Sequence, residues 1–446
     1  MTSGILKACW SFFLIVLLQA CTGLPPVTET AVTEEISTRT GLAVEDTENA
    51  EGFWIPPSVN IDDGLAENEA AIIALANNAR FQADLAELGL ARADLITAGE
   101  LPNPVFTLLF PVDTSLNEFS LAQMLSFLWQ RPKRMQASSL NVDQVADNLI
   151  QNGLALVMNT NIAHAEYIYT RDNARLSQSL ADVLKQMAGI LEAKLKAGDA
   201  SETEAAIIQN DALLMQDDAI NARYEADAAS YRLKTLMGFD EMTRTIEPVA
   251  EEGSCETSFD TQALLEQALN ARPDLAAAKI NISQTGEKLG LEKANILNLT
   301  ATLDANEQPD GEYDLSPRLD IELPILSQNQ GGRARAKVEL EQAMSEYLAK
   351  KHEVSLQVHD AIAQTSTSCE RLSYWQKEIF PRMQQQDAMV NKAYDAGEIA
   401  YLSVLTNQQK LIGAQRSMAS AVLNQKKAMA KLNFSVGQKV TGDKQK

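Results

Sequence analysis

Residues 197–238 read AGDASETEAAIIQNDALLMQDDAINARYEADAASYRLKTLMG, and residues 396–437 repeat the pattern without a gap as AGEIAYLSVLTNQQKLIGAQRSMASAVLNQKKAMAKLNFSVG. The identical positions are small, apolar or amide residues: Ala197, Gly198, Gln209, Gln216, Ala222, Ala229, Leu233 and Gly238 recur as Ala396, Gly397, Gln408, Gln415, Ala421, Ala428, Leu432 and Gly437. Two apolar rows also step by seven in each copy. These rows are Ala205, Ala212 and Ala219 beside Ala206, Leu213 and Ile220, then Val404, Leu411 and Met418 beside Leu405, Ile412 and Ala419. A sustained step of seven predicts helices packed side by side as a coiled coil, in two structural repeats.

Long proline-free segments surround these two copies. Proline is absent from Lys133 to Glu247, from Ile325 to Phe380, and after Pro381. Ala, Leu, Gln, Glu and Lys dominate these segments and favour helix, so we expect helices far longer than those of an ordinary globular domain.

Each repeat is interrupted by a segment that predicts a β-hairpin, at about residues 104–126 and 297–324. The second segment alternates clearly: one face would hold Leu299, Ala301, Leu303, Leu319, Ile321 and Leu323, and the other Asn298, Thr300, Thr302, Asp304, Asp320 and Glu322. This alternation is typical of a membrane β-barrel strand, and equally of a soluble half-buried strand. The smallest membrane barrels use about eight strands and lipid tolerates no open sheet edge, so several chains would have to pool their strands. Three chains with four strands each would supply twelve.

Residues 1–20 have the pattern of a secretory signal peptide. Their apolar run, at 8–18, is shorter than the roughly 20 residues that span a bilayer. It leads into LQAC at 18–21, which is similar to a bacterial lipobox and predicts a lipid on Cys21. Thr22, where many inner-membrane lipoproteins have Asp, favours sorting to the outer membrane. A plain signal peptide with an unrelated cysteine is the alternative.

The composition excludes several classes of function. The chain has 446 residues and a formal net charge of −22, so binding nucleic acid through its phosphates is not expected. Its histidines, His164, His352 and His359, do not cluster, so we expect no metal site. The sequence has no nucleophile–base constellation, Gly-rich phosphate loop or CxxC pair, so neither catalysis nor a cofactor is predicted.

These signals predict the organisation of the chain. A lipoprotein signal peptide (1–20) precedes a lipid-anchored, mostly irregular tether (21–60), which is rich in Thr, Glu and Pro. The remaining segments are the first repeat (61–240), a connector (241–262), the second repeat (263–437) and a polar tail (438–446).

Several short motifs stand in a fixed order along the chain. They are Arg272-Pro273-Asp274-Leu275, Leu323-Pro324-Ile325-Leu326, Gly332-Arg333-Ala334-Arg335-Ala336, and Tyr394-x-Ala396-Gly397-Glu398 with Leu402-x-Val404-Leu405. With the duplication, this order resembles the TolC-like outer-membrane efflux channel family across nearly all of the mature sequence. Leu101-Pro102-Asn103-Pro104 and Ser120-Leu121-Ala122-Gln123 further resemble its lipoprotein branch linked to heavy-metal resistance.

The resemblance implies a mainly α fold with a small β part. A duplicated long-helix coiled-coil tunnel would extend into the periplasm, and a homotrimer would pool four β-strands per chain into an outer-membrane β-barrel. The chain would be a passive exit duct, without catalysis, for substrates that an inner-membrane pump delivers through a periplasmic adaptor. Outer-membrane lipid would be its further partner. The substrate stays open between metal cations and drugs or other small molecules.

Two other functions stay open at this point. One is a structural coiled-coil outer-membrane lipoprotein, which would explain the helices but has no need of two alternating hairpins. The other is the outer channel of a secretion system.

The resemblance also assigns roles to single residues. The turns at Gly198 and Gly397, with the neighbouring Asp199 and Glu398, would be the tips that contact the adaptor; plain turn glycines are the alternative. Many family members carry acidic residues six and nine positions after the second tip glycine, where they narrow the tunnel mouth. Six and nine positions after Gly397 the chain has Ser403 and Thr406, and six positions after Gly198 it has Glu204. These three residues are the positions that would form such a constriction here. Among them only Glu204 is acidic, and a solvated helix face is the competing interpretation.

Removal of residues 1–20 and lipidation of Cys21 leave Cys255 and Cys369 as the thiols of the mature chain. Cys255 lies in the connector, which in this family folds against the outside of the tunnel about half-way along it. Cys369 would lie at a similar height, about 54 Å along a helix from Arg333. In an oxidising periplasm the resemblance favours a Cys255–Cys369 disulfide, and two separate thiols are the alternative.

Overall fold

The computed structural model describes residues 27–43, 53–61, 63–110, 117–243, 245–250, 255, 259–308 and 310–440. These residues form two compact units. Unit 1 contains residues 27–31, 88–146 and 283–340, and unit 2 contains the described parts of 32–87, 147–282 and 341–446.

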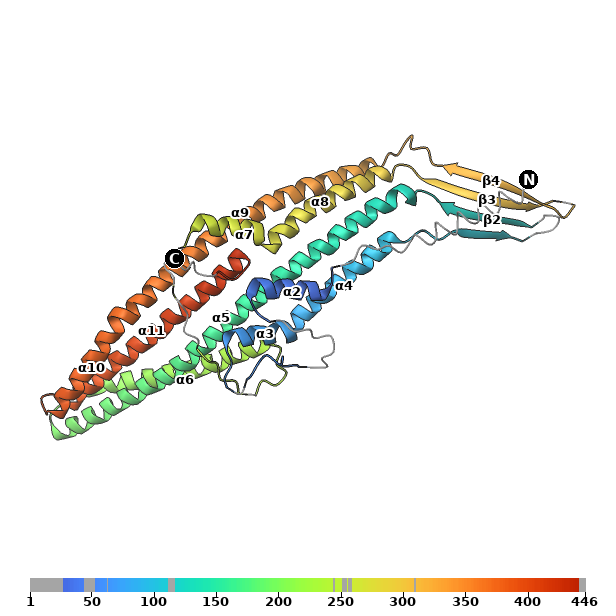
Figure 1. Ribbon diagram of the computed structural model, residues 1–446. Coiled ribbons are helices and arrows are strands. Elements are labelled where there is room, and N and C mark those ends of the chain that lie inside the picture. Colours follow the sequence, from blue (N-terminus) through green and yellow to red (C-terminus); the bar gives the residue numbers. More distant parts are fainter. Residues whose placement is uncertain are drawn as a thin grey trace. The chain divides into compact units, whose positions relative to one another are not determined.

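The described residues are mainly helical and include four antiparallel strands (Figure 1). The strands are β1 (Val105–Leu109), β2 (Glu118–Met124), β3 (Leu299–Glu307) and β4 (Tyr313–Ile321). The helices are α2 (Glu29–Thr40), α3 (Glu67–Asn77), α4 (Ala79–Gly99), α5 (Phe127–Ala197), α6 (Glu202–Leu236), α7 (Thr261–Ala271), α8 (Pro273–Ala294), α9 (Gln330–Tyr374), the π-helical turn η1 (Trp375–Ile379), α10 (Phe380–Asp395) and α11 (Tyr401–Val436). Among the described residues, no helix combines the length and the hydropathy needed to cross a membrane.

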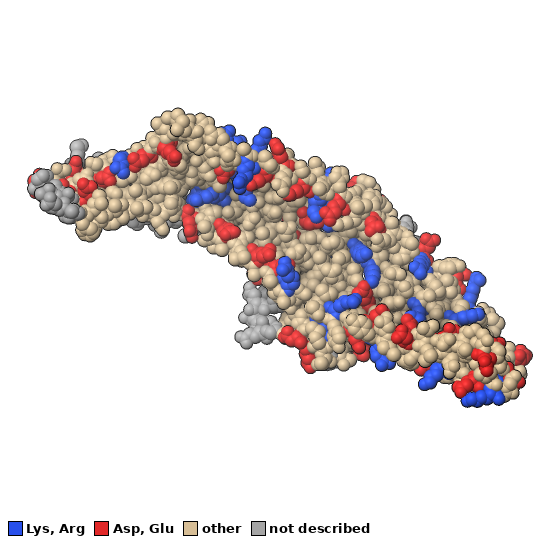
Figure 2. All heavy atoms as spheres, turned by 180° about the vertical axis from the view of Figure 1, so that it is seen from behind, with Lys and Arg blue, Asp and Glu red and all other residues tan. Residues whose placement is uncertain are grey.

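Unit 1 contains one antiparallel sheet with the strand order β1-β2-β3-β4. Leu299 lies opposite Ile321, and Ala301 opposite Leu319, so the two predicted hairpins and the predicted alternation are confirmed. Large apolar side chains on one face are exposed: Phe106, Leu121, Leu303, Leu315, Leu319 and Ile321. In Figure 2 the surface over the strands accordingly carries few charged side chains.

The opposite face of this sheet is polar along β3 and β4, whereas β1 places the exposed Val105 and Leu109 on it. Arg318 of β4 lies 3.3 Å from the Asp304 carboxylate and 3.2 Å from the Asp320 carboxylate. Within the described residues, β1 and β4 each pair on one side only. The described part of a single chain therefore presents two open sheet edges, one apolar face, and a second face that is polar over β3 and β4.

Hydrogen bonds join the strands of unit 1 to the adjoining helix ends. Ser126 Oγ accepts from the backbone N–H of Leu299 at 2.8 Å. Trp129 Nε1 donates to the Ala294 carbonyl at 3.1 Å, so this indole is tied to the end of α8.

Unit 2 is built from helices, and its hairpins α5–α6 and α10–α11 lie side by side (Figure 1). Their apolar contact buries Val183, Leu184 and Met187 of α5 with Leu405 of α11. A second cluster packs α7 against α9 and α11; its buried members are Leu264, Ala268, Val354, Val358, Ala361, Ile362, Leu432 and Val436.

The predicted seven-residue seam is only partly buried. In α6, Ala219 is buried, but Leu213 and Ile220 of the neighbouring row are 67% and 60% exposed. Among the described residues, no helix covers the side of α6 that carries Leu213 and Ile220, so this second apolar row stays exposed.

The expected irregular tether (21–60) is wrong for part of its length, because Glu29–Thr40 forms helix α2. Val32 and Ile36 of this helix are buried in unit 2. Ile36 lies against Gly153 of α5 so closely that a side chain at Gly153 would overlap it. Two apolar residues on one helical turn give too weak a periodic signal to be recognised in a Thr- and Glu-rich sequence.

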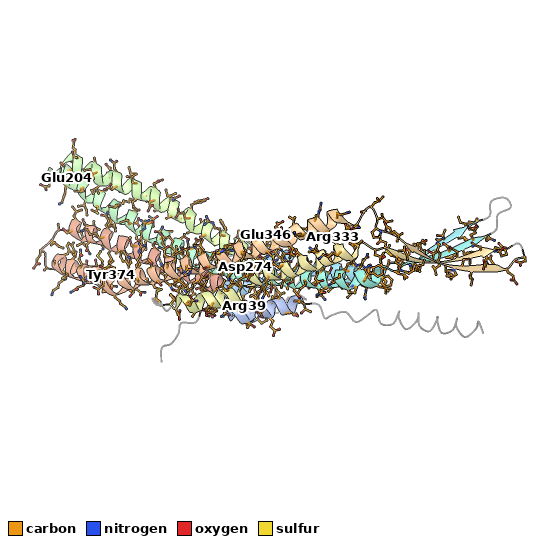
Figure 3. All side chains as sticks on the ribbon, turned by 90° about the horizontal axis from the view of Figure 1, so that it is seen from above. Arg39, Glu204, Asp274, Arg333, Glu346 and Tyr374 are labelled. Carbon is orange, nitrogen blue, oxygen red and sulfur yellow. A yellow bond between two sulfur atoms is a disulfide. The ribbon has the colours of Figure 1, made fainter. Side chains whose placement is uncertain are left out.

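Arg39 anchors the end of α2 and the start of the predicted polar tail (Figure 3). Its Nη1 donates to the carbonyls of Ala271 and Gly437, and its own carbonyl accepts from the backbone N–H of Lys439 at 2.8 Å. The tail therefore begins in contact with α2 rather than as a separate segment.

The long helix predicted up to Phe380 contains one irregularity, the π-helical turn η1. There the backbone N–H of Phe380 donates to the carbonyl of Trp375, five residues earlier. Pro381 follows directly and has no N–H to donate, which explains why the regular helical ladder changes at this point.

Candidate functional site: the ends of the two helical hairpins

The two hairpins of unit 2 end in equivalent glycine turns. Gly198 and Gly397 have φ values of 85° and 76°, which side chains rarely adopt. After each glycine the next backbone N–H bonds back to a carbonyl five residues earlier, Asp199 to Lys194 at 2.8 Å and Glu398 to Ala393 at 2.9 Å. This Schellman pattern ends α5 and α10, and the chain reverses direction in a tight turn.

The predicted tip residues are exposed. No atom lies within 4 Å of the position that a Cβ would take at Gly198 or Gly397. Asp199 and Glu398 are likewise exposed beside these turns. In Figure 2 acidic and basic side chains gather at the end of the hairpins. The turns are therefore accessible and carry charge.

The two hairpin ends are held together in unit 2. Besides the Leu405 cluster, the Tyr401 hydroxyl lies 3.4 Å from Gln186 Oε1 of α5, and the rings of Tyr394 and Tyr401 lie 5.5 Å apart. The geometry thus brings the residues of both predicted tips to the same end of one unit.

Glu204 caps the start of α6 (Figure 3). Its carboxylate accepts from the Ser201 backbone N–H and from the Ser201 hydroxyl, each at 3.0 Å, while Ser201 Oγ accepts from the Glu204 backbone N–H at 3.1 Å. These two donors at Ser201, the backbone N–H first, lower the pKa of Glu204 below its ordinary value. The arrangement is a capping box, in which Glu204 stabilises the first turn of α6.

The equivalent turn of α11 lacks this box. Ala400 provides no side-chain cap, Ser403 is exposed, and Thr406 Oγ1 donates to the Leu402 carbonyl of its own helix at 2.9 Å. Within the described part of the chain, no hydrogen bond joins Glu204 to Ser403 or Thr406.

Sequence reasoning missed a polar network farther along these hairpins. Arg416 of α11 donates to Asn173 Oδ1 of α5 at 2.8 Å and lies 3.3 Å from the Asp218 carboxylate of α6. Ser177 of α5 donates to the same carboxylate at 3.3 Å. Arg416 therefore connects α11 with both helices of the other hairpin. A lone Arg on a helix carries no sequence signal for its partners.

A second missed set is buried between α10 and α11. Asn407, which is 5% exposed, donates to Asp387 Oδ1 at 2.6 Å and accepts from Gln386 at 3.0 Å. A single buried amide on a coiled-coil seam selects one register of the two helices.

Cys255 and Cys369 form a disulfide bond, with their Cα atoms 5.4 Å apart. Cys369 is completely buried on α9, whereas Cys255 is exposed in the connector. Cys21, the predicted lipid attachment site, lies outside the described residues.

One of the three histidines, His164, has a clear structural partner. His164 is buried, and its Nε2 lies 2.8 Å from the Leu65 carbonyl. Throughout the described ranges, no group of three His, Cys, Asp or Glu side chains is arranged to hold a metal ion.

Comparison with known proteins supports a channel fold. Residues 264–438 match the family described as outer membrane efflux protein. The chain is 24% identical over 363 residues to the cobalt-zinc-cadmium resistance protein CzcC of Cupriavidus metallidurans, covering 78% of this chain and 84% of that protein. It is 28% identical over 182 residues to the toluene efflux pump outer membrane protein TtgF of Pseudomonas putida, 37% of each chain.

Solved structures share the fold of this chain over most of its length. The Campylobacter jejuni CmeC outer membrane channel superposes with a TM-score of 0.69 at 16% identity, covering 90% of this chain and 92% of that one. The Neisseria gonorrhoeae MtrE outer membrane channel gives 0.66 at 16% identity, covering 92% and 99%. Residues 264–438 are thus similar by sequence to the outer membrane efflux proteins, and the chain as a whole has the TolC-like fold of these solved outer-membrane channels.

Proposed function

We propose that this outer-membrane efflux channel works as a homotrimer and forms a passive exit duct of a tripartite system. The observation that carries the proposal is the sheet of unit 1, with its exposed apolar face, its polar face and its two open edges. Lipid tolerates the apolar face but not the open edges, so the edges of neighbouring copies must pair. The exposed row with Leu213 and Ile220 on α6 supports the same conclusion for the helices.

The adaptor would bind at the glycine turns. Gly198 and Gly397 leave the backbone open there, and the exposed carboxylates of Asp199 and Glu398 offer acceptors to a protein partner. An inner-membrane pump would deliver the substrate through this adaptor. Glu204, Ser403 and Thr406 lie in the first turns of the adjoining helices, where a narrow tunnel mouth would form.

Cys21 would carry the lipid that anchors the mature N-terminus in the outer membrane. The lipobox-like sequence supports this proposal. Helix α2, docked eight residues after Cys21 through Val32 and Ile36, would hold the anchored segment against unit 2.

For the substrate we favour metal cations over organic solvents. The similarity to CzcC covers most of the chain, whereas the similarity to TtgF covers 37% of it. In a bacterial strain without its own outer channels, this protein with its adaptor and pump should restore growth on cobalt, zinc or cadmium and not on toluene.

The duct itself is tested separately from the substrate. Purified mature protein should run as a heat-modifiable trimer on a gel and should conduct ions in a planar lipid bilayer. A monomeric protein without conductance would favour a structural lipoprotein instead.

A further inference from the structure

Helix α11 is unusual in a chain with a net charge of −22, because all of its charged side chains are cationic. They are Lys410, Arg416, Lys426, Lys427 and Lys431. Arg416 pairs with Asp218 at 3.3 Å, Lys426 with Glu67 at 2.8 Å, and Lys427 with Glu166 at 2.5 Å. Within the described residues, Lys410 and Lys431 form no such pair. Part of the positive charge of α11 is therefore uncompensated.

Lys431 lines a groove between α9 and α11 in unit 2. The groove has a volume of about 450 Å³. Its polar lining residues include Gln364, Thr367 and Arg371 of α9 and Asn424, Lys427 and Lys431 of α11, and none of its lining residues is acidic. Arg371, like Lys431, is exposed and forms no ion pair among the described residues. The groove thus offers a guanidinium and an ammonium without carboxylate partners, together with hydroxyl and amide donors.

The groove lies on the side of α11 that faces away from Ala250, a described residue of the connector. Ala419, Val422 and Lys426 of α11 line a different cavity together with Glu67 of α3 and Ala250 of the connector. At 3.6 residues per turn, the side of α11 that carries Asn424 and Lys431 lies roughly opposite to the side that carries these three residues. No described residue of the connector or of α3 lines the basic groove.

We propose that the groove between α9 and α11 binds small oxyanions such as phosphate or a carboxylate. A planar guanidinium can donate two parallel hydrogen bonds to such an anion, and an ammonium adds a point charge. Since both side chains are exposed, binding needs no costly desolvation of a buried ion. If the proposed duct is correct, the side of α11 opposite the connector faces the lumen, and each trimer holds three such sites. The sites would then hold the counter-ions of the exported cations.

The test is binding of inorganic phosphate to the solubilised mature protein, measured by isothermal titration calorimetry at low ionic strength. Wild type should bind saturably, and Arg371→Gln with Lys431→Gln should weaken binding by about tenfold or more, because charge-assisted hydrogen bonds are lost. The matched control is Lys410→Gln, which removes an exposed and unpaired cation of α11 outside the groove and should bind as wild type does. The absence of saturable binding by wild type, or equal loss in the control, would overturn the proposal.

A bilayer experiment separates this inference from the proposed duct. In a salt gradient, the double variant should shift the reversal potential toward greater cation selectivity, with the trimer and its open conductance retained. Conductance without any shift refutes the lumenal site alone, whereas the absence of conductance in wild type refutes the duct.

Discussion

The two repeats turn at equivalent glycines, yet the helices that follow these turns, α6 and α11, differ in their surface charge and in their N-terminal caps. Helix α6 carries an acidic surface that includes Asp211, Asp217, Asp218, Glu225 and Asp227, whereas the charged residues of α11 are all cationic. α6 begins with a complete capping box and α11 with an uncapped Ala400. Duplication thus preserved the turn and the small seam residues, while the surfaces became complementary: Arg416 of α11 meets Asp218 of α6.

The connector shows the same asymmetry. On the first repeat it is held by Arg171, whose Nη1 lies 3.1 Å from the Glu247 carboxylate and donates to the Pro248 carbonyl at 3.1 Å. On the second repeat it is held by the covalent Cys255–Cys369 bond. One attachment is polar and partly exposed, and the other is covalent.

The largest effect is expected from removing the covalent attachment. Closing a loop of 114 residues is worth about 4–5 kcal/mol in the chain-entropy model, so Cys255→Ser with Cys369→Ser should lower the apparent free energy of unfolding by up to that amount. Arg171→Gln should lower it by about 1 kcal/mol or less, because this pair is partly exposed. Urea unfolding of the solubilised protein measures both. Two free thiols per chain in denatured, unreduced wild type would show that the covalent attachment does not form.

The next largest effect is expected at the four glycines that recur in the two repeats, Gly198, Gly238, Gly397 and Gly437. All have positive φ, but a methyl group at Gly238 would overlap the Asn77 carbonyl, whereas the space around Gly198 is open. Gly238→Ala should therefore cost about 3 kcal/mol or more and Gly198→Ala only about 1 kcal/mol. Gly437→Ala should fall between them, since its methyl group would lie 3.2 Å from Arg272 Cγ and 3.3 Å from Arg272 Cα, closer than ordinary contact but without the overlap found at Gly238. Similar unfolding midpoints for Gly238→Ala and Gly198→Ala would contradict the structure.

The complementary charges of α6 and α11 should contribute less. Arg416 and Asp218 are 28% and 40% exposed, so their coupling should be about 1 kcal/mol and should decrease with salt. A double-mutant cycle with Arg416→Gln and Asp218→Asn measures this coupling. The same cycle between Lys410→Gln and Asp218→Asn is the control and should give a coupling near zero.

The smallest effect concerns the helix starts. Ser201→Ala should weaken the first turn of α6 by about 1 kcal/mol, and Ala400→Ser should strengthen that of α11 by a similar or smaller amount. Because the folded pKa of Glu204 is lowered, its stabilising contribution is complete above its ordinary value of 4.5 and is lost as the pH falls through the lowered pKa. Hydrogen-exchange protection at residues 202–205 should fall over that range, while residues 401–404 should show no matching change.

Much of the fold follows from local patterns that a reader of the sequence can recognise. The hairpins near 104–126 and 297–324 were predicted from alternation, and the turns at Gly198 and Gly397 from the duplication. Helix α2 was missed because its buried face has two apolar residues, Val32 and Ile36, whose burial depends on contacts with distant helices such as α5.

The candidate sites likewise include some features that the local sequence predicts and others that only the tertiary structure shows. The exposed glycine turns are local features, whereas the capping role of Glu204 became visible only with its hydrogen bonds to Ser201. Arg416 and Asp218 lie on different helices, and nothing in either local sequence indicates which acid the arginine meets.

Periodicity and turn residues, which act within a few positions of one another, were enough to define two repeats, their long helices and their hairpins. The pairing of surfaces depends instead on how each helix is rotated about its own axis, and side chains of several helices determine that rotation together. It leaves Leu213 and Ile220 of α6 exposed and brings Arg371 and Lys431 into one groove, although these two cations are far apart in the chain. Contacts of this kind exist only once the helices have packed, because no single segment contains the information that places them.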